Sequence, residues 1–286
     1  MVKTGAGAPA ALKGHWFMLI IGERINSTRK GIEQAIRKRD RDAIVSESLR
    51  QAEAGANFLD VNCGTLDAAD EPAALEWLVR VVQDSVDLPL CIDSPNPDAL
   101  AAGLAVHRGE PIINSISGES ERFKKVLPLI KQYNGAVVAL CLDDGGIPPD
   151  RNTAIEVGGG LVGALTDAGV PIDKIYLDPL VRSVATSPLT VLDTLAVIET
   201  LRVKYPGLHF VSGLSNVSYG LPERRHLNRA YVVMSIVSGL DAVIMDPLDD
   251  LMHALIYAAE ALVNQDRFCL KYIKAYQEKK LSFDRN

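Results

Sequence analysis

The feature that most constrains the fold is an alternation, repeated eight times, of a short apolar run with a longer amphipathic segment. Apolar runs bounded by Gly, Pro, Asn or Asp are typical of strands, and the segments between them are long enough for helices. The expected strands are residues 17–25, 57–64, 89–94, 111–117, 135–143, 174–180, 209–216 and 241–248. The expected helices include residues 73–86 and segments that begin at Pro97 and after Pro188, Pro222 and Leu248.

Eight strand–helix units in a chain of this length predict an α/β protein, a single (β/α)8 TIM barrel. Because no Pro/Ser-rich linker or low-complexity tract divides the chain, we expect residues 17–286 to form one barrel domain. Residues 1–16 are expected to be an N-terminal tail outside the fold. A doubly wound open sheet is the rival, but the first strand is not followed by a GxGxxG motif.

The overall charge argues against two classes of partner. The net charge is −6 and no basic stripe is present, so we expect no nucleic acid. The longest apolar runs, residues 17–21 and 136–142, are too short to span a bilayer, and residues 1–15 lack the apolar core of a signal peptide. We therefore expect no membrane association.

The cysteines indicate the compartment. Cys63, Cys91, Cys141 and Cys269 form no CxxC pair and no cluster with His at zinc spacing. Small buried thiols in a reducing compartment are the better interpretation, which predicts a cytoplasmic protein.

Polar residues follow the apolar runs at the strand ends, where barrel enzymes place their chemistry. They are Glu23, Arg24, Asn26, Asp60, Asn62, Asp93, Asn114, Asp143, Asp144, Asp178, Ser215, Asn216 and Asp246. Any single one could be a helix cap or turn former, as we expect for Ser94 and Ser187. Because every strand end carries an acid or an amide, a shared binding mouth is the better explanation.

The composition of this mouth narrows the ligand. No lysine is placed for a Schiff base, and no basic, Gly-rich phosphate site is evident after the seventh and eighth strands. Carboxylates suit a donor-rich heterocycle, since an amino-pyrimidinone presents an N–H edge that a carboxylate accepts in bidentate fashion. A divalent metal held by Asp60, Asp93, Asp178 and Asp246 is the alternative, but no His accompanies them, and we expect no metal.

Six motifs in order give the chain a recognisable pattern: "IGERIN", "LDVNCG", "CIDS", "INSIS", "YLDPL" and "GLSNVSYGLPER". In this it resembles the methyltetrahydrofolate:corrinoid protein methyltransferases. These are pterin-binding methyltransferases related to the folate domain of cobalamin-dependent methionine synthase. The resemblance runs from about residue 18 to residue 265 and implies a pterin-binding (β/α)8 barrel.

The resemblance also implies site residues. The family's folate pocket positions carry Asp93, Asn114, Asp178 and Asn216 here, and Asn216 is the expected catalytic residue beside N5. The remaining positions expected to bind substrate are Glu23 and Asn26 in the first-strand motif, Ser215, and Arg224 in the loop after the seventh strand.

The implied reaction is methyl transfer, in either direction, between N5 of tetrahydrofolate and the cobalt of a corrinoid. Tetrahydrofolate or 5-methyltetrahydrofolate is then the bound small molecule. The cobalamin is expected on a separate corrinoid protein that docks over the mouth. A homodimer is a further expectation from the family.

Two alternatives stay open at this stage. Dihydropteroate synthase shares the barrel and pocket, but needs basic residues near the seventh and eighth strands for a pyrophosphate leaving group, and "GLSNVS" is less basic there. A folate-binding barrel without turnover is the non-enzymatic alternative. Arg225 and His226 either point into solvent or touch the folate tail or the partner.

Overall fold

The computed structural model describes residues 17–187 and 190–281. The expected tail, residues 1–16, therefore lies outside the described residues, as do Pro188 and the last five residues of the expected domain. None of the helices in the described part of the chain combines the length and apolar character needed to cross a membrane.

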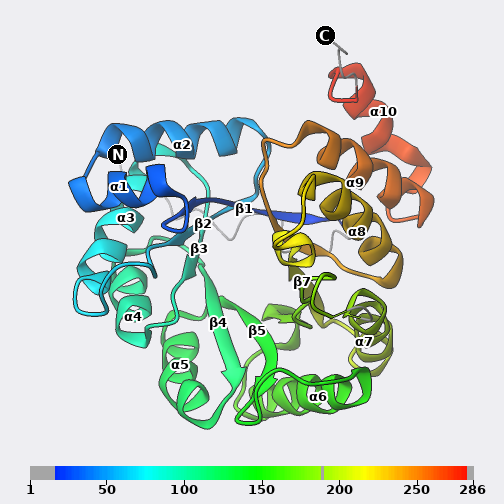
Figure 1. Ribbon diagram of the computed structural model, residues 1–286, viewed down its shortest axis with the longest axis horizontal. Helices are drawn as coiled ribbons and strands as arrows, with labels where there is room; N and C mark the ends of the chain where they lie inside the picture. The colour runs from blue at the N-terminus through cyan, green and yellow to red at the C-terminus, as the bar shows by residue number, and fades with distance from the viewer. Residues whose placement is uncertain (1–16, 188–189, 282–286) are drawn as a thin grey trace, which may run out of the picture.

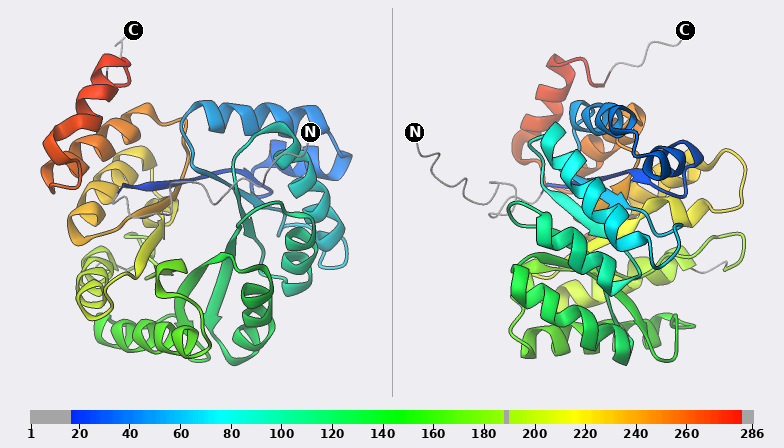
Figure 2. Two further views of the ribbon diagram at one scale, coloured as in Figure 1. Left: turned by 180° about the vertical axis from the view of Figure 1, so that it is seen from behind. Right: turned by 90° about the vertical axis from the view of Figure 1, so that its left-hand side faces the viewer.

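The strands form a closed barrel in chain order, and helices surround it on the outside (Figures 1 and 2). Neighbouring strands are parallel, and β8 pairs with β1 to close the ring. The strands are β1 Leu19–Asn26, β2 Phe58–Asn62, β3 Leu90–Asp93, β4 Ile112–Gly118, β5 Ala136–Asp143, β6 Ile175–Asp178, β7 His209–Gly213 and β8 Ala242–Met245. The predicted (β/α)8 barrel is confirmed.

Helices follow each strand, with α1 and α2 between β1 and β2, and α9 and α10 after β8. They are α1 Lys30–Lys38, α2 Arg41–Glu53, α3 Glu71–Ser85, α4 Pro97–Val106, α5 Ser120–Tyr133, α6 Arg151–Asp167, α7 Thr190–Lys204, α8 Arg224–Ser238, α9 Asp250–Leu262 and α10 Leu270–Gln277. Several begin with a side-chain cap: Asp40 accepts from Ala43 N–H, and Asn96 accepts from Asp98 N–H. Pro97 begins α4, as its position in the sequence predicted.

Two apolar layers hold the barrel together. Alternate strand residues face the barrel interior, where Ile21, Phe58 and Tyr176 belong to a compact buried cluster. The other set, which includes Ile20 and Leu59, packs against the surrounding helices. The interior is therefore filled with side chains, and ligands can reach only its ends.

The seventh strand is shorter than the sequence predicted. It ends at Gly213, and a 3-10 turn, Leu214–Ser218, takes the chain away from the sheet. Asn216 consequently lies on a turn above the barrel instead of on the strand. Similarly, β6 ends at Asp178, because Pro179 has no N–H to continue the ladder.

Candidate functional site

A polar layer lies directly above the apolar filling of the barrel. Residues two apart on a strand face the same side, and Phe58, Cys91 and Tyr176 face inward. The next inward positions are Asp60, Asp93, Asn114 and Asp178, joined by Glu23 after Ile21. The two-residue period of the strands therefore places all five side chains on the inner side of the barrel, at its carboxyl end.

The acid half of the mouth comprises Asp60, Asn62, Asp93, Asn114 and Asp178. Asn62 donates an Nδ2 hydrogen bond of 2.8 Å to Asp93, and Asn114 lies 3.5 Å from Asp60 Oδ1. Asp60 is only 2% exposed. Burial raises the pKa of Asp60 well above its usual value, and the nearby Asp93 carboxylate raises it further. The carboxyl oxygens of Asp60 and Asp93 are thus placed where the N–H groups of a ligand can donate hydrogen bonds to them.

Asp178 is the buried acid on the opposite side of this half. Burial raises its pKa to about 6, although hydrogen bonds from the Leu180 and Gly213 backbone N–H groups oppose the shift. The same burial raises the pKa of Asp93, where the hydrogen bond from Asn62 opposes it. Raised pKa values of neighbouring buried carboxyls are typical of functional residues.

Arg122 is a residue that the sequence analysis missed. Its guanidinium donates to the backbone oxygens of Ser115 at 2.6 Å and Ser94 at 2.8 Å, and also to Pro95 O. It therefore ties the ends of β3 and β4 together beneath the mouth, and its charge lowers the pKa of Asp93. The only sequence signal was a cation in the first turn of the helix after the fourth strand, where the helix dipole disfavours it.

Asn216 is exposed, and its amide is available. Within the described residues its side chain makes no hydrogen bond, and neither the 3-10 turn nor α8 uses it as a cap. The side chain lies over Gly213, since a Cβ built there would stand 3.1 Å from Asn216 Nδ2. The cap interpretation of Asn216 is therefore wrong. Ser94, in contrast, is a turn former: it is buried, and its Oγ accepts from Asn96 N–H at 2.9 Å.

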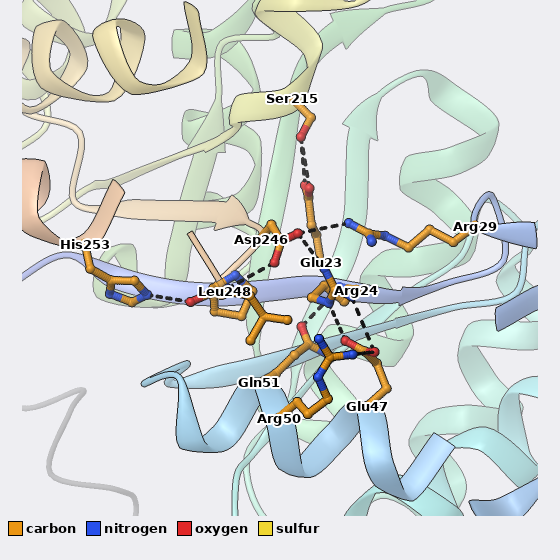
Figure 3. A network of polar contacts seen from close by, with 11 residues as sticks. Glu23, Arg24, Arg29, Glu47, Arg50, Gln51, Ser215, Asp246, Leu248 and His253 are labelled. Atoms are coloured by element: carbon orange, nitrogen blue, oxygen red, sulfur yellow. Dashed lines mark hydrogen bonds and ion pairs between the residues drawn. The ribbon is translucent and has the colours of Figure 1, made fainter. Parts of the chain in front are cut away.

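The arginine half of the mouth comprises five arginines from β1, the loop after it, α2 and the first turn of α8: Arg24, Arg29, Arg50, Arg224 and Arg225. Figure 3 shows its inner network. Arg24 pairs with Glu47 and donates to Asp246 at 2.6 Å, while Arg29 reaches Asp246 at 3.4 Å. Ion pairs thus connect β1, α2 and β8.

Glu23 links this network to the loop after β7 (Figure 3). Ser215 Oγ donates to the Glu23 carboxylate at 2.9 Å. Burial raises the pKa of Glu23, although the Ser215 hydrogen bond and the Arg29 charge oppose the shift. Two of the expected substrate-binding residues are therefore in contact with each other at the edge of the site.

The five arginines and Glu23 line one polar cavity of about 390 Å³. The sequence analysis did not predict this cavity, whose arginines come from β1, the loop before α1, α2 and the first turn of α8. Arg24, Arg50 and Arg225 come from three elements far apart in the sequence, and barrel closure brings them together. No local sequence motif predicts this cluster of arginines.

The other two expected site residues lie near the mouth in local contacts. Asn26 Oδ1 accepts from Thr28 N–H at 3.0 Å and so forms a turn at the end of β1. Arg224 donates to Ser218 Oγ at 3.1 Å and to the Ser215 backbone oxygen, so it holds the turn that carries Asn216.

The acids proposed as an alternative metal site do not gather in one place. Asp246 is engaged by two arginines, whereas Asp60 and Asp93 lie together in the acid half. Across residues 17–187 and 190–281, no group of three or more His, Cys, Asp or Glu side chains is arranged to hold a metal ion.

Fold and site together define a (β/α)8 barrel whose mouth carries buried or partly buried carboxyls and amides at the ends of β2, β3, β4 and β6. The chain belongs to the pterin binding enzyme family, whose sequence profile matches residues 22–246. Among curated proteins it is similar to the methylcorrinoid:tetrahydrofolate methyltransferase of Eubacterium limosum, with 36% identity over 266 residues. That match covers 92% of this chain and 98% of the relative.

Two further comparisons place the chain more broadly. It is 30% identical over 241 residues to the methionine synthase of Mycobacterium tuberculosis; the match covers 80% of this chain and 20% of that longer protein. Its fold matches solved dihydropteroate synthases. The Xanthomonas albilineans enzyme in complex with 7,8-dihydropteroate has a TM-score of 0.66 at 18% identity, covering 88% of this chain and 94% of that one. The dihydropteroate synthase likeness concerns the fold alone.

Proposed function

We propose that the protein is a methyltransferase that moves a methyl group between the cobalt of a protein-bound corrinoid and N5 of tetrahydrofolate. The observation that carries the proposal is the match to a methylcorrinoid:tetrahydrofolate methyltransferase over nearly the full length of both chains. The acid half supplies the chemistry that a pterin ring requires.

The acid half binds the pterin edge. Asp93 and Asp178 accept hydrogen bonds from the amino-pyrimidinone N–H groups, and Asn114 adds a contact beside them. The supporting observations are the burial of Asp178 and Asn114 and the position of all three on strand ends of the rigid barrel. Loss of water from this site strengthens each hydrogen bond.

Asn216 acts at N5. In the direction of the relative's name, N5 attacks the methyl carbon, and the N5–C bond forms as the cobalt–carbon bond breaks. The electron pair stays on cobalt, which leaves as Co(I), and N5 releases its proton to solvent water. The Asn216 carbonyl accepts the N5–H and orients the lone pair, and in reverse its NH2 donates to N5. Its exposure and free amide support this role.

The remaining site residues position these groups. Glu23 holds Ser215 by a hydrogen bond, and Arg224 holds the Ser215 carbonyl, so both fix the turn that presents Asn216. Asn26 shapes the end of β1 beside the ligand. We assign all four to substrate binding through this turn and the mouth that it borders.

The corrinoid arrives on a partner protein. Every strand in the described residues belongs to the barrel, and a corrin is too large for a pterin pocket. We therefore propose that a corrinoid protein docks over the mouth, so that the cobalt approaches N5 from the solvent side. Cobalamin is in this sense a substrate carried by the partner.

The test is a methyl-transfer assay with a methylated corrinoid protein and tetrahydrofolate. We expect the products to be 5-methyltetrahydrofolate and Co(I), and the change in corrinoid absorbance monitors the reaction. We expect the reverse reaction when 5-methyltetrahydrofolate is supplied with the Co(I) form. Folate binding without turnover, with every methylcorrinoid donor tried, would identify a non-enzymatic folate-binding barrel.

Dihydropteroate synthase is the second candidate, and the arginine half is the observation that favours it. Five arginines near β1, β7 and β8 could accept a pyrophosphate leaving group. Incubation with a pterin pyrophosphate and 4-aminobenzoate tests this directly. Release of pyrophosphate at a rate above that of methyl transfer would replace the first proposal.

We also propose a homodimer in the cytoplasm. Val203, Val237 and Leu262 are 83%, 67% and 85% exposed at the ends of α7, α8 and α9, an apolar surface that a second copy would cover. All four cysteines are free, which fits a reducing compartment. Analytical ultracentrifugation of the wild type and of Val237→Lys tests the dimer, and cell fractionation tests the location.

A further inference from the structure

We propose that the arginine half of the mouth binds the carboxylates of the substrate's glutamate tail, and that several γ-linked glutamates bind more tightly than one. The inference rests on the proposed function, since it assigns the tail of the same folate. It concerns a separate part of the mouth, a cavity whose lining includes neither Asp93 nor Asp178.

The arginine half carries more positive charge than its own carboxylates neutralise. Arg24 and Arg50 share Glu47, while Arg24 and Arg29 share Asp246. Glu23 also lines the cavity, whereas Asp249 is paired with Arg229 outside the cluster. The five arginines therefore face three carboxylates: Glu23, Glu47 and Asp246. The protein as a whole has a net charge of −6, so this local excess is not a general property of its surface.

Arg224 and Arg225 add two charges without an acid in contact. Arg224 donates only to Ser218 Oγ and to the Ser215 carbonyl. Arg225 is exposed and, within the described residues, makes no hydrogen bond or ion pair. Both stand in the first turn of α8, where the helix dipole disfavours cations. Helix stability therefore does not explain them, whereas an anion in the cavity does.

The place of the cavity fits the path of the tail. N5 of a pterin is adjacent to C6, and C6 carries the aminobenzoyl-glutamate. If N5 lies beside Asn216 after β7, the tail leaves the ring on that side. The next strands around the barrel are β8 and β1, and their ends border the arginine half. The tail therefore passes from the acid half directly over the arginines.

The size and geometry of the cavity suit this ligand. A volume of about 390 Å³ lies within the range of small-molecule sites. Guanidinium groups bind carboxylates in bidentate fashion, and several arginines can engage successive glutamates. Because Arg29 and Arg225 are partly or fully accessible, a longer tail can extend past them into solvent.

The experiment measures the affinities of three ligands by calorimetry: a tail-less tetrahydropterin, tetrahydrofolate with one glutamate, and tetrahydrofolate with three. Wild type, Arg225→Gln, Arg29→Gln and a control, Arg80→Gln, are compared at low and high ionic strength. Arg80 is an exposed arginine on α3 that pairs with Glu76 and lies outside the cavity.

We expect affinity to increase with the number of glutamates, by about two- to fivefold for each arginine engaged. This gain should shrink in Arg225→Gln and Arg29→Gln and at high salt, and persist in Arg80→Gln. Equal affinities for the three ligands, or an unchanged gain in both cavity variants, would overturn the inference while leaving the proposed function intact. Failure of the wild type to bind any of the three pterins would overturn the proposed function itself.

Discussion

The acid half and the arginine half of the mouth share one barrel, yet different interactions order them. The acid half uses short side chains that project from strands, and Asp60, Asn114 and Asp178 are buried. The arginine half uses long side chains from the end of β1, the loop after it, α2 and α8, and partly buried ion pairs hold Arg24, Arg29 and Arg50. A rigid half suits a rigid ring, and an adaptable half suits a flexible tail.

The turn that carries Asn216 lies where the two halves meet. Glu23 and Arg224 hold it from the arginine side through Ser215, and Gly213 N–H contacts Asp178 on the acid side. The reacting atom of the substrate is therefore expected between a half that fixes the ring and a half that retains the tail. Substitutions in each half should consequently change different measured quantities.

The largest effect is expected at the boundary, from Asn216→Ala. Loss of one preorganised hydrogen-bonding group at the reacting atom costs roughly 2.7–4 kcal/mol in the transition state, about a hundred- to a thousandfold in rate. Folate affinity should change far less, because Asn216 holds no other group in place. Stopped-flow transfer rates and ligand titrations separate the two. Equal losses in rate and affinity would contradict the assignment of Asn216 to N5.

In the acid half, Asp178→Asn should abolish tight folate binding. The substitution keeps an oxygen that can accept from Leu180 N–H, but replaces a charged acceptor of the pterin edge with a neutral amide. A hydrogen bond to a charged group contributes about 1.5–3 kcal/mol, so affinity should fall roughly ten- to a hundredfold. Calorimetry measures the loss. Near-normal affinity, with an unchanged melting temperature, would remove Asp178 from the pterin edge.

The acid half could be predicted from the sequence, and the arginine half could not. Asp60, Asp93 and Asp178 each follow an inward-facing strand residue by two positions, so strand period and barrel geometry place them. Arg24 and Asp246, by contrast, are 222 residues apart and meet only because β8 closes onto β1.

The same distinction applies to the ends of elements. The end of β6 could be read from Pro179, but the end of β7 at Gly213 could not, because no proline or charge follows it. Residues 214–216 continue the apolar and small pattern of the strand. Ser215 in this turn donates to Glu23, 192 residues away in the sequence, a contact that only the folded barrel supplies.

The two halves should also differ in pH dependence. Burial raises the pKa of Asp178 to about 6, and the ionised form accepts the pterin edge. Affinity for a tail-less tetrahydropterin should therefore be full above this pKa. Below it, affinity should fall by at least about tenfold for each pH unit, because Asp93 titrates in the same range. Arginines do not titrate in this range, so the added affinity of a glutamate tail should stay constant. Calorimetry between about pH 5 and pH 7.5 measures both.

The control for this prediction is Asp178→Asn, whose residual pterin binding should keep only the shallower pH dependence that Asp93 contributes, since burial raises the pKa of Asp93 to about 6 as well. The free protein should show the opposite trend in stability. Because the folded-state pKa of Asp178 lies above its usual value of 3.8, the folded protein retains a proton that the unfolded chain has lost. The contribution of Asp178 to the free energy of unfolding should therefore increase as the pH falls through 6. A pterin affinity that is flat across this window would contradict the assignment.

The smallest effect, and the sharpest test of the boundary, is expected from Gly213→Ala. The backbone at Gly213 has a φ of −73°, which alanine adopts without strain. The new methyl group would stand 3.1 Å from Asn216 Nδ2, so the amide must move by a few tenths of an ångström. We expect the transfer rate to fall about three- to tenfold, because small displacements of a preorganised group weaken its contact in the transition state. The affinities for the pterin ring and for the glutamate tail should both stay near those of the wild type.

Gly163→Ala on α6, where nothing lies within 4 Å of the added Cβ, is the matched control and should leave the rate unchanged. A rate loss in Gly213→Ala accompanied by weaker binding of the tail-less pterin would show that Gly213 supports the acid half, through its N–H to Asp178, more than it supports Asn216.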